Sequence, residues 1–360
     1  MSSSEALENL RKRIDEIDRK LLELLSERGR VAIEISKLKK ENSFSVYDPA
    51  REREIEKNIT KINRGPLSKE SIISIFREII SGCRSIQNRV RIAYLGPEGS
   101  FSHQAAFHEF GASVDFDPVP SFEEVFEEVE KQRASFGVVP VENSMEGSVG
   151  GVLDRFIASD LSVSSEFFER VSHFLLSKTD DIKNIEVVAS HPQALGQCKR
   201  WLSHNLKHVE LRETTSTAKA AQLASRDKKI AAIAGELSAT IYKLKILERH
   251  IEDNPGNTTR FLVIGRMHSR PTGSDKTSIV FSLKDEPAAL QKALLPFAEA
   301  QINLTKIESR PSKGRPWEYV FFVDFEGHSE DEGIRSVLSA VEKNCIFLKV
   351  LGSYPSGKSE

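Results

Sequence analysis

Several cationic side chains fall on the apolar face of the first helix that the sequence predicts. Over residues 7–40, two seam positions of a heptad repeat hold nine apolar residues and Arg28. Lys39 follows Arg28 by eleven residues, which corresponds to about 20° around a helix and about 16 Å along it. Converging cations repel one another unless an anion joins them, and arginine binds carboxylates bidentately. The pattern therefore predicts a small ligand with at least two carboxylates.

Arg28 by itself also has a structural explanation, because one polar residue on a coiled seam sets the register of the helices. Arg51 and Glu52, at the start of the next predicted helix, favour the ligand. Arg11 lies about 25 Å from Arg28 along the helix, so only an antiparallel partner helix could bring a second Arg11 beside it. No nucleophile or base accompanies these cations. The site is therefore suited to binding and electrostatic stabilisation rather than to proton transfer.

A second group of polar residues follows strand-like segments in the middle of the chain. Hydroxyls, amides and an arginine collect there, next to glycines that let backbone approach a ligand closely. Helix caps and turns use the same residue types, so capping or turn formation could explain any one of these segments. It explains less well why all of them occur together. The segments are residues 94–102, 138–144, 190–193, 215–217 and 257–261. They predict a ligand site at strand ends, between two lobes.

Periodicity divides the chain into three parts. Residues 1–90 predict an all-α unit of three helices: one over residues 7–40, one after Asp48-Pro49 and one after Gly65-Pro66. Residues 91–268 alternate short β-branched runs with helical stretches. This predicts an α/β domain with a largely parallel sheet, and a break near residues 170–175 predicts two lobes. Residues 274–360 follow the order βαββαβ, which predicts a ferredoxin-like α+β module with strands at 277–283, 304–309, 317–325 and 347–353.

Composition narrows the classes of function. The formal net charge of −2 predicts no general attraction to nucleic acid or to an anionic membrane. No apolar run approaches the roughly 18 residues that span a bilayer, and the N-terminus lacks the features of a signal peptide. Three scattered cysteines and an isolated His204/His208 pair favour neither a disulfide framework nor a metal site. We expect a cytoplasmic, metal-free protein. Since one very long helix cannot cover its own apolar stripe, we also expect a homodimer or higher homo-oligomer.

Residues 5–90 resemble the all-helical chorismate mutases that are fused to prephenate dehydratase. The resemblance implies an intertwined dimer and the rearrangement of chorismate to prephenate without a cofactor. Arginines, with Arg11 supplied by the partner, would hold the two carboxylates. Lys39 and Gln87 would be the catalytic donors to the ether oxygen, Glu52 would hold the substrate hydroxyl, and Cys83 stands where some relatives have a serine. The implied active-site positions are Arg11, Arg28, Lys39, Asp48, Arg51, Glu52, Cys83 and Gln87.

Residues 91–265 resemble the prephenate dehydratases, whose Thr-Arg-Phe signature stands at residues 259–261. The resemblance implies a two-lobed fold similar to periplasmic binding proteins. It also implies a cofactor-free reaction that expels carbon dioxide and the ring hydroxyl of prephenate and leaves phenylpyruvate. Thr259 would be catalytic, and Arg260 would bind a substrate carboxylate. The other implied cleft residues are Glu142, Asn143, Ser144, Ser190, His191, Ser216 and Thr217.

The last part resembles the phenylalanine-binding ACT domains of dehydratases, since Glu-Ser-Arg-Pro stands at residues 308–311. The resemblance implies feedback inhibition by L-phenylalanine. Arg310 taken singly fits a surface charge. Ala288 replaces the glycine of the family's Gly-Ala-Leu helix start, and its extra methyl group is expected to weaken effector binding. The implied effector-binding residues are Ala288, Ala289, Leu290, Asn303, Leu304, Glu308 and Ser309.

Two other interpretations stay open at this point. One is a non-catalytic amino-acid-binding regulator, which Thr259 and the cationic helical core oppose. The other is a dehydratase whose first 90 residues only dimerise or bind nucleic acid. Residues 1–90 hold 19 Lys and Arg against 15 Asp and Glu, a net charge of +4. Phosphate-binding charges should lie outside, whereas Arg28 lies on the apolar seam. We therefore expect both enzymatic activities.

Overall fold

The computed structural model describes residues 3–41, 47–312 and 319–357 of the chain, which divides into two compact units. Each unit is described by itself. The first unit consists of Met1–Asp48, Glu54–Val90 and Phe110–Asp115, and the second consists of Pro49–Arg53, Arg91–Glu109 and Phe116–Glu360.

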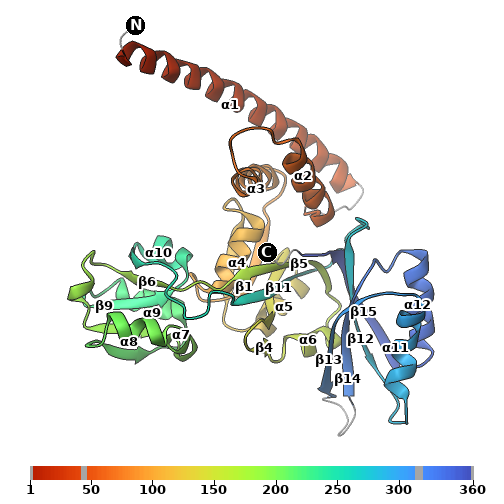
Figure 1. Cartoon of the computed structure of the whole chain (residues 1–360). Coiled ribbons are helices and arrows are strands. Elements are labelled where there is room, and N and C mark those ends of the chain that lie inside the picture. Colours follow the sequence, from red (N-terminus) through yellow and green to blue (C-terminus); the bar gives the residue numbers. More distant parts are fainter. Residues whose placement is uncertain (1–2, 42–46, 313–318, 358–360) are drawn as a thin grey trace. The chain divides into compact units, whose positions relative to one another are not determined.

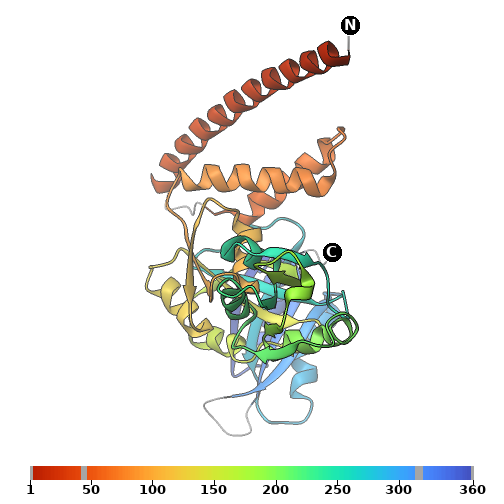
Figure 2. The same cartoon turned by 90° about the vertical axis from the view of Figure 1, so that its left-hand side faces the viewer.

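Three helices confirm the all-α prediction for the N-terminal part: α1 (Ser3–Glu41), α2 (Pro49–Ile62) and α3 (Lys69–Ser85). Helix α1 is one unbroken, gently curved helix in both views (Figure 1, Figure 2). All nine apolar residues of its predicted seam are exposed, from 43% at Ile35 to 61% at Leu24 and Leu38. Ser68 is the N-cap of helix α3, and its side chain accepts a hydrogen bond from the backbone N–H of Ser71. The first helix therefore forms as predicted, with its apolar stripe uncovered.

The first lobe of the second unit is built on a sheet with the strand order β2-β1-β3-β11-β5, in which β4 also pairs with β3. Ser121 is the N-cap of helix α5, and its side chain accepts a hydrogen bond from the backbone N–H of Glu124. The elements of this lobe are β1 (Arg91–Leu95), α4 (Phe101–Phe110), β2 (Asp115–Val119), α5 (Phe122–Glu130), β3 (Phe136–Asn143), β4 (Gly147–Ser148), α6 (Val152–Ala158), β5 (Ser162–Arg170) and β11 (Thr258–Gly265).

The second lobe has the strand order β10-β6-β9-β7-β8. All five residues of its β9 are buried, as expected of a strand whose sheet is covered on both faces. The elements of this lobe are β6 (Phe174–Ser177), the 3-10 helix η1 (Ile182–Asn184), β7 (Val187–Ser190), α7 (Pro192–Gln197), α8 (Lys199–Asn205), β8 (Glu210–Glu213), α9 (Thr217–Ala224), β9 (Ile230–Ala234), α10 (Glu236–Tyr242) and β10 (Lys245–Glu248).

Both sheets are mixed, so the prediction of a largely parallel sheet is wrong. Strand β1 pairs parallel with β3, and β7 pairs parallel with β8 and β9. Strand β11 runs antiparallel to β3 and β5, and β6 runs antiparallel to β9 and β10. These two strands enter their sheets directly from the other lobe. No crossover helix within the same sheet precedes them, and such a helix is what makes consecutive strands parallel.

Two hinge segments connect the lobes, one between β5 and β6 and the other between β10 and β11. The segments pair with each other, since the N–H of Val171 donates to the C=O of Asn257 at 2.9 Å and the N–H of Ile251 donates to the C=O of His173 at 3.0 Å. The break predicted near residues 170–175 is confirmed by the first segment.

The C-terminal module has the predicted order βαββαβ and an antiparallel sheet β13-β14-β12-β15. The expected beginning of its third strand at residue 317 lies outside the described residues. The elements of this module are β12 (Asp275–Ser282), α11 (Ala289–Glu299), β13 (Leu304–Pro311), β14 (Tyr319–Glu326), α12 (Glu332–Glu342) and β15 (Phe347–Pro355).

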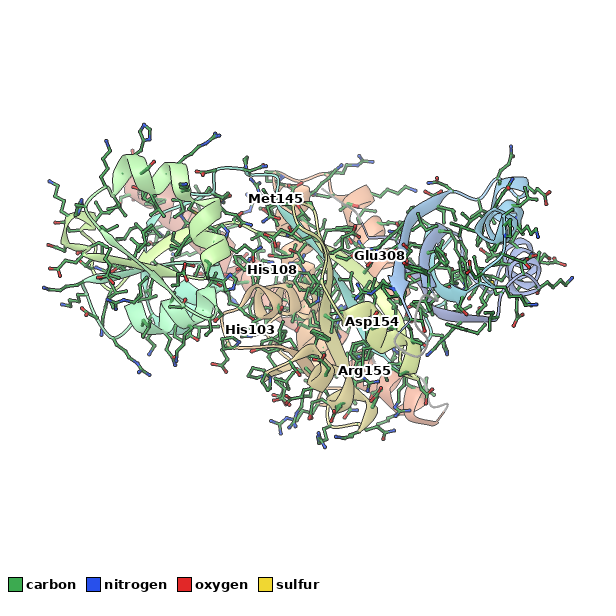
Figure 3. The ribbon with its side chains drawn as sticks, turned by 90° about the horizontal axis from the view of Figure 1, so that it is seen from below. His103, His108, Met145, Asp154, Arg155 and Glu308 are labelled. Atoms are coloured by element: carbon green, nitrogen blue, oxygen red, sulfur yellow. The ribbon has the colours of Figure 1, made fainter. Side chains whose placement is uncertain are left out.

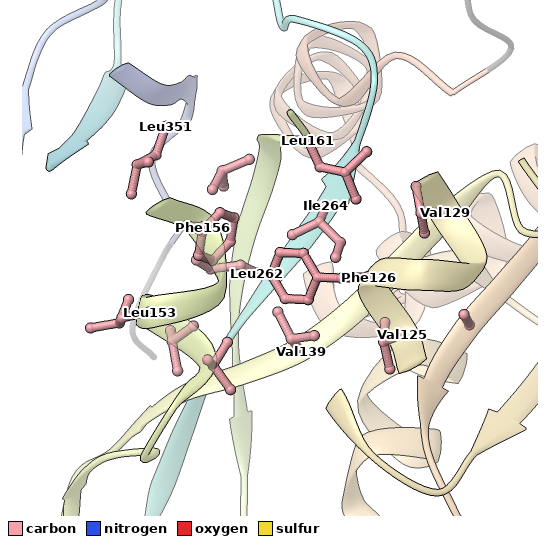
Figure 4. Close-up of a cluster of buried hydrophobic side chains, with 14 of the residues drawn as sticks. Val125, Phe126, Val129, Val139, Leu153, Phe156, Leu161, Leu262, Ile264 and Leu351 are labelled. Carbon is pink, nitrogen blue, oxygen red and sulfur yellow. The ribbon is translucent and has the colours of Figure 1, made fainter. Parts of the chain in front are cut away.

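The sheet of the module buries apolar side chains on both faces, and all eight residues of β12 are buried. On one face, Phe281 and Phe325 belong to the cluster that includes residues of α11 and α12. On the other face, Leu351 joins the core of the first lobe with Phe156 and Leu262 (Figure 4). The module and the first lobe therefore share a hydrophobic core.

Candidate active sites

Thr259 and Asn143 lie side by side on neighbouring strands of the first lobe. Strand β11 pairs with β3 so that Thr259 is opposite Asn143 and Arg260 is opposite Glu142. Successive side chains of a strand point to opposite faces, so the two pairs lie on different faces of the sheet. Asn143 Nδ2 donates to Thr259 Oγ1 at 2.9 Å, and Thr259 is buried. The structure therefore brings Thr259 and Asn143 together and separates both from Arg260.

The amide group of Asn143 is held in one orientation. Its Oδ1 accepts hydrogen bonds from the backbone N–H groups of Met145, at 3.0 Å, and Glu146, at 3.2 Å. Its Nδ2 is consequently directed at Thr259 Oγ1 and at Asn257 Oδ1, which lies 2.7 Å away. Because Thr259 Oγ1 accepts this bond, its own proton points elsewhere, and it has no acceptor among the residues that the structure describes.

Arg260 lies on the opposite face, in a buried ionic cluster with the C-terminal module. Its guanidinium donates to Glu166 at 2.7 Å, to Asp324 at 2.5 Å and to the hydroxyl of Tyr354 at 3.0 Å. Glu166 is fully buried and also binds Lys276 Nζ at 2.7 Å. Burial lowers the pKa of Arg260, but Tyr354, Asp324 and Glu166 raise it by more. Arg260, the expected ligand of a substrate carboxylate, is therefore already engaged by two protein carboxylates.

Glu142 shares the face of Arg260. Its carboxylate lies 2.9 Å from Lys306 Nζ of β13 and 3.9 Å from the guanidinium of Arg260, and its side chain is 41% exposed. Lys306 also contacts Glu308 at 3.3 Å. Glu142 and Asn143, both expected to line the cleft, therefore lie on opposite faces of the sheet, because adjacent strand residues point to opposite sides.

The turn after β3 touches both lobes. Ser144 Oγ accepts the N–H of Thr258 at 2.9 Å, which ties the turn to the beginning of β11. The carboxylate of Glu146 accepts a hydrogen bond from the side-chain amide of Gln193 on α7, in the second lobe. Met145, between them, is exposed (Figure 3). The predicted residue Ser144 therefore lies where the two lobes meet.

Four predicted cleft residues lie at the ends of second-lobe strands or the starts of helices. Ser190, at the end of β7, is buried, and its Oγ donates to the C=O of Ile233 at 2.6 Å. His191 is the N-cap of α7, and Ser216 is the N-cap of α9, whose first residue is Thr217. Each of these side chains except Thr217 has a local structural partner, which agrees with the interpretation as caps and turns.

Asn257, from the predicted segment 257–261, is joined at this site by Gln197 and His173, which no sequence pattern singled out. Asn257 is 2% exposed, and its Nδ2 donates to Oε1 of Gln197 at 3.5 Å. His173 Nε2 lies 2.7 Å from the same oxygen. Burial lowers the pKa of His173, although Gln197 and Glu252 act in the opposite direction. Gln197 and Asn257 are 60 residues apart in the chain and meet at the hinge, so no local pattern could have predicted their contact.

In the helical unit, Arg28 and Lys39 are half-buried on α1, whereas Arg11 is exposed near its beginning. Ser36 Oγ of α1 donates to the C=O of Gln87 at 3.1 Å, so the end of α3 lies against α1. The side-chain Oε1 of Gln87 is buried without a hydrogen-bond partner among the described residues. Cys83 is half-buried one turn before it. The buried amide oxygen is the feature that most favours a polar ligand here, because a lone buried acceptor is costly.

Arg51 and Glu52 lie in the first turn of α2, directly after Asp48. Arg51 is exposed, and Asp48 and Glu52 are half-buried. Arg51 and Glu52 therefore lie at the start of the second helix, as predicted.

The predicted effector residues divide between two layers of the C-terminal module. Ala288 precedes α11 with a φ of 63°, a left-handed conformation that glycine adopts without strain. Ala289, Leu290 and Leu304 pack against the cluster beneath the helices, whereas Asn303 and Ser309 are exposed.

Glu308 lies in strand β13, within the strand predicted at residues 304–309, and its carboxylate accepts from Ser148 of the first lobe. Desolvation raises the pKa of Glu308, but the bond from Ser148 and the cations Lys306 and Arg310 lower it by more. Arg310 binds both carboxylate oxygens of Asp154 on α6, at 2.7 and 3.3 Å, so it is not a free surface charge. Asp154 and Glu308 are labelled where the module meets the first lobe (Figure 3).

Among the described residues, no group of three or more His, Cys, Asp and Glu side chains is placed to hold a metal ion. None of the described helices is both long enough and apolar enough to cross a membrane.

Family models match three consecutive stretches of the chain: chorismate mutase type II over residues 10–88, prephenate dehydratase over residues 92–269 and ACT domain over residues 277–343. The chain is 48% identical to a bifunctional chorismate mutase/prephenate dehydratase of Aquifex aeolicus, over 98% of each chain. It is 43% identical to a protein of the same description from Pseudomonas aeruginosa, over 99% of each. A solved prephenate dehydratase of Arthrobacter aurescens in complex with L-Phe is 31% identical, with a TM-score of 0.68 over 74% of this chain and 90% of that chain. The chain belongs to the family of bifunctional chorismate mutase/prephenate dehydratases of phenylalanine biosynthesis.

Proposed function

We propose that residues 1–90 rearrange chorismate to prephenate, that residues 91–268 convert prephenate to phenylpyruvate, and that residues 274–360 bind L-phenylalanine as a feedback inhibitor. The family matches over residues 10–88, 92–269 and 277–343 support this division. The match to a type II mutase opposes an inert helical arm. Free thiols at Cys83, Cys198 and Cys345 agree with the cytoplasm as the compartment.

The bond from Asn143 to Thr259 is the observation that carries the dehydratase mechanism. Asn143 donates to Thr259 Oγ1, which leaves the threonine proton available to another acceptor. A threonine hydroxyl is too weak an acid to protonate a leaving group by itself near neutral pH. Its role is that of a positioned donor that stabilises negative charge on the departing hydroxyl.

The reaction itself needs no external oxidant or reductant. The bond between the ring and its carboxylate breaks, carbon dioxide leaves, and the electron pair enters the ring. The carbon–oxygen bond to the ring hydroxyl breaks at the same time, and the departing hydroxide takes up a proton to become water. Aromatisation supplies the driving force, so the enzyme must chiefly orient the substrate and stabilise the leaving oxygen.

With Arg260 engaged by Glu166 and Asp324, we assign substrate carboxylate binding to other groups. The beginning of α9 offers the hydroxyl of Thr217 and first-turn N–H groups, and the beginning of α7 offers His191. Helix beginnings favour anions because their N–H groups and the helix dipole point toward them.

The mutase reaction is an intramolecular rearrangement, which needs orientation and charge stabilisation but no proton transfer. Arg28, Arg51 and the partner subunit's Arg11 would hold the two carboxylates, and Glu52 would hold the substrate hydroxyl. Lys39 and Gln87 would donate to the ether oxygen as charge develops there. The end of α3, which carries Gln87, lies against α1, which carries Lys39, and this supports the assignment.

The exposed apolar seam of α1 supports a second copy of the chain as its cover. Nine apolar side chains exposed along one helix form a stripe that a partner helix would bury, at about 1.5 to 3 kcal/mol for each fully buried side chain. An antiparallel copy would also bring an Arg11 beside Arg28.

Regulation by L-phenylalanine is supported by the contacts of β13 with the first lobe. Lys306 binds Glu142, which neighbours Asn143 on β3, and Asp324 binds Arg260, which neighbours Thr259 on β11. A small cavity of about 20 Å³ lined by Arg260 and Lys306 lies at this contact. A displacement of the module would therefore act on the strands that carry Asn143 and Thr259.

One assay tests the whole proposal: purified chain is given chorismate, prephenate and phenylpyruvate are followed, and L-phenylalanine is then added. We expect prephenate followed by phenylpyruvate, and a slower second step with the amino acid present. No phenylpyruvate would favour the non-catalytic regulator instead.

A further inference from the structure

Asn257 touches three parts of the dehydratase at once: the first-lobe strands, the hinge and helix α7 of the second lobe. It lies in the hinge segment just before β11, and its C=O accepts from Val171 on the other hinge segment at 2.9 Å. Its Oδ1 accepts from Asn143 Nδ2 at 2.7 Å, and its Nδ2 donates to Gln197 Oε1 at 3.5 Å. The side chain of Asn257 therefore makes a polar contact with each lobe.

Asn143, Asn257, Gln197 and His173 form a series of hydrogen bonds. The direction of each bond follows from the orientation of the Asn143 amide. Two backbone N–H groups occupy Asn143 Oδ1, so its Nδ2 must face Asn257 and the acceptor there must be Oδ1. Asn257 Nδ2 then faces Gln197, which must present Oε1. His173 Nε2, 2.7 Å from the same oxygen, must carry a proton.

His173, the last residue of this hydrogen-bond series, lies in the hinge. His173 is buried, and its backbone N–H donates to the carboxylate of Glu252 at 2.8 Å. The hydrogen bonds therefore run from a fixed hinge residue, through Gln197 of the second lobe and Asn257, to Asn143 and Thr259 of the first lobe. The series is complete only when the two lobes have this arrangement, because Gln197 and Asn143 belong to different lobes.

We infer that Asn257 is a positioning residue of the dehydratase, which holds the Asn143 amide so that Thr259 keeps its proton for the departing substrate hydroxyl when the lobes are in this arrangement. The inference rests on the role proposed above for Thr259. Asn257 itself need not touch the substrate. Loss of its side chain should therefore reduce turnover more than it weakens substrate binding.

The first experiment measures prephenate turnover by full-length Asn257→Leu, which keeps the approximate volume and removes both hydrogen bonds. We expect kcat to fall about 10-fold to 10²-fold with KM changed much less. The mutase rate of the same sample, started from chorismate, should not change. A wild-type kcat would overturn the inference.

A double-mutant comparison separates this inference from the proposed role of Thr259. If Asn257 acts through Thr259, adding Asn257→Leu to Thr259→Val should cost little beyond Thr259→Val alone. Full additivity of the two losses would show that Asn257 acts elsewhere and would overturn the inference. Full activity of Thr259→Val would instead refute the proposed role of Thr259, and with it the inference that Asn257 acts through that residue.

If the leucine variant does not fold, the pH dependence of kcat in an aspartate variant provides a second test. In Asn257→Asp, the ionised carboxyl can accept from Asn143 but cannot donate to Gln197, and it adds negative charge near an anionic substrate. When protonated, it regains a donor. The matched control is Asn254→Asp, three residues earlier, where Oδ1 only accepts from Gly256 N–H and an aspartate can do the same.

His173 and Glu252, the titratable groups next to this hydrogen-bond series, are common to both variants. We expect the ratio of kcat of Asn257→Asp to that of Asn254→Asp to rise as the pH falls from about 8 to about 5, since a buried aspartate has a raised pKa. A ratio that stays constant and close to one would contradict the positioning role.

Discussion

The helical unit and the dehydratase lobes place their candidate catalytic residues in opposite ways. On α1, Arg11 is exposed and Arg28 is half-buried, about 25 Å apart along one helix. In the dehydratase, Asn143 and Thr259 are far apart in the chain and meet at 2.9 Å. A long helix spreads its residues along an axis, whereas a sheet with returning strands gathers distant residues at one place.

The comparison has a consequence for how each site is completed. The helical unit leaves its apolar seam exposed, so a second copy of the chain is expected to supply both the missing cover and the missing cation. The dehydratase residues meet within one chain, between two lobes that share hinge hydrogen bonds. One site should therefore depend on association, and the other should not.

The largest effect is expected from Arg28→Ala. Removal of a charge-assisted donor from a partly buried site should lower mutase turnover by roughly 10²-fold to 10³-fold or more. Dehydratase turnover, measured with prephenate, should stay near the wild-type rate because its residues lie in the other unit. An equal loss of both activities would mean that the variant is misfolded or that the sites are not independent.

Mixing Arg11→Ala chains with Arg28→Ala chains sharpens the same comparison. If the partner supplies Arg11, then one of the two sites in a mixed dimer has both arginines, and part of the mutase activity returns. Light scattering should confirm that mixed dimers form. Complete absence of recovery in such dimers would show that the site is not shared.

Thr259→Val should reduce dehydratase turnover about 10²-fold, because valine keeps the shape of threonine and removes the donor. The melting temperature should change little, and the mutase rate in the same sample should not change. Thr259→Ser, which keeps the hydroxyl, should retain most activity. A fully active valine variant, or a serine variant that is as inactive as valine, would count against the hydrogen-bonding role.

A smaller effect is expected where the C-terminal module meets the dehydratase. Lys306→Gln removes the ion pairs with Glu142 and Glu308, and we expect L-phenylalanine inhibition to weaken about fivefold, at the low end of typical allosteric coupling. Lys292→Gln is the matched control, since Lys292 forms only an exposed pair with Glu286 in the same module. If L-phenylalanine inhibited both variants equally, the coupling between effector and dehydratase would not depend on the ion pairs of Lys306.

The smallest effect is expected from Ala288→Gly. Glycine relieves the left-handed φ of 63°, so the free energy of unfolding should rise by up to about 1 kcal/mol. L-phenylalanine should also inhibit more strongly, by less than about tenfold. Ala289→Gly, at the first residue of α11, is the control and should destabilise by a similar amount. If Ala288→Gly also lowered the free energy of unfolding, the backbone at Ala288 would not be strained.

The sequence by itself determined the local elements and the resemblance to the family. Heptad spacing predicted the helix that became Ser3–Glu41, and alternation of short apolar runs with helices predicted the two lobes. These features depend on neighbours within one or two turns, so a periodic pattern records them. The signature at residues 259–261 likewise identified Thr259 as a candidate before any partner was known.

Only the tertiary structure decided which face each signature residue occupies and what it meets there. Thr259 and Arg260 are adjacent in the chain, but the pleat of β11 directs one to Asn143 and the other to Asp324 of the C-terminal module. Arg310, which fits a surface charge in the sequence, binds Asp154 across the same contact. Strand direction and long-range charge pairing depend on residues far away in the chain, 64 to 156 positions for these three contacts, and a local pattern of residue types does not contain that information.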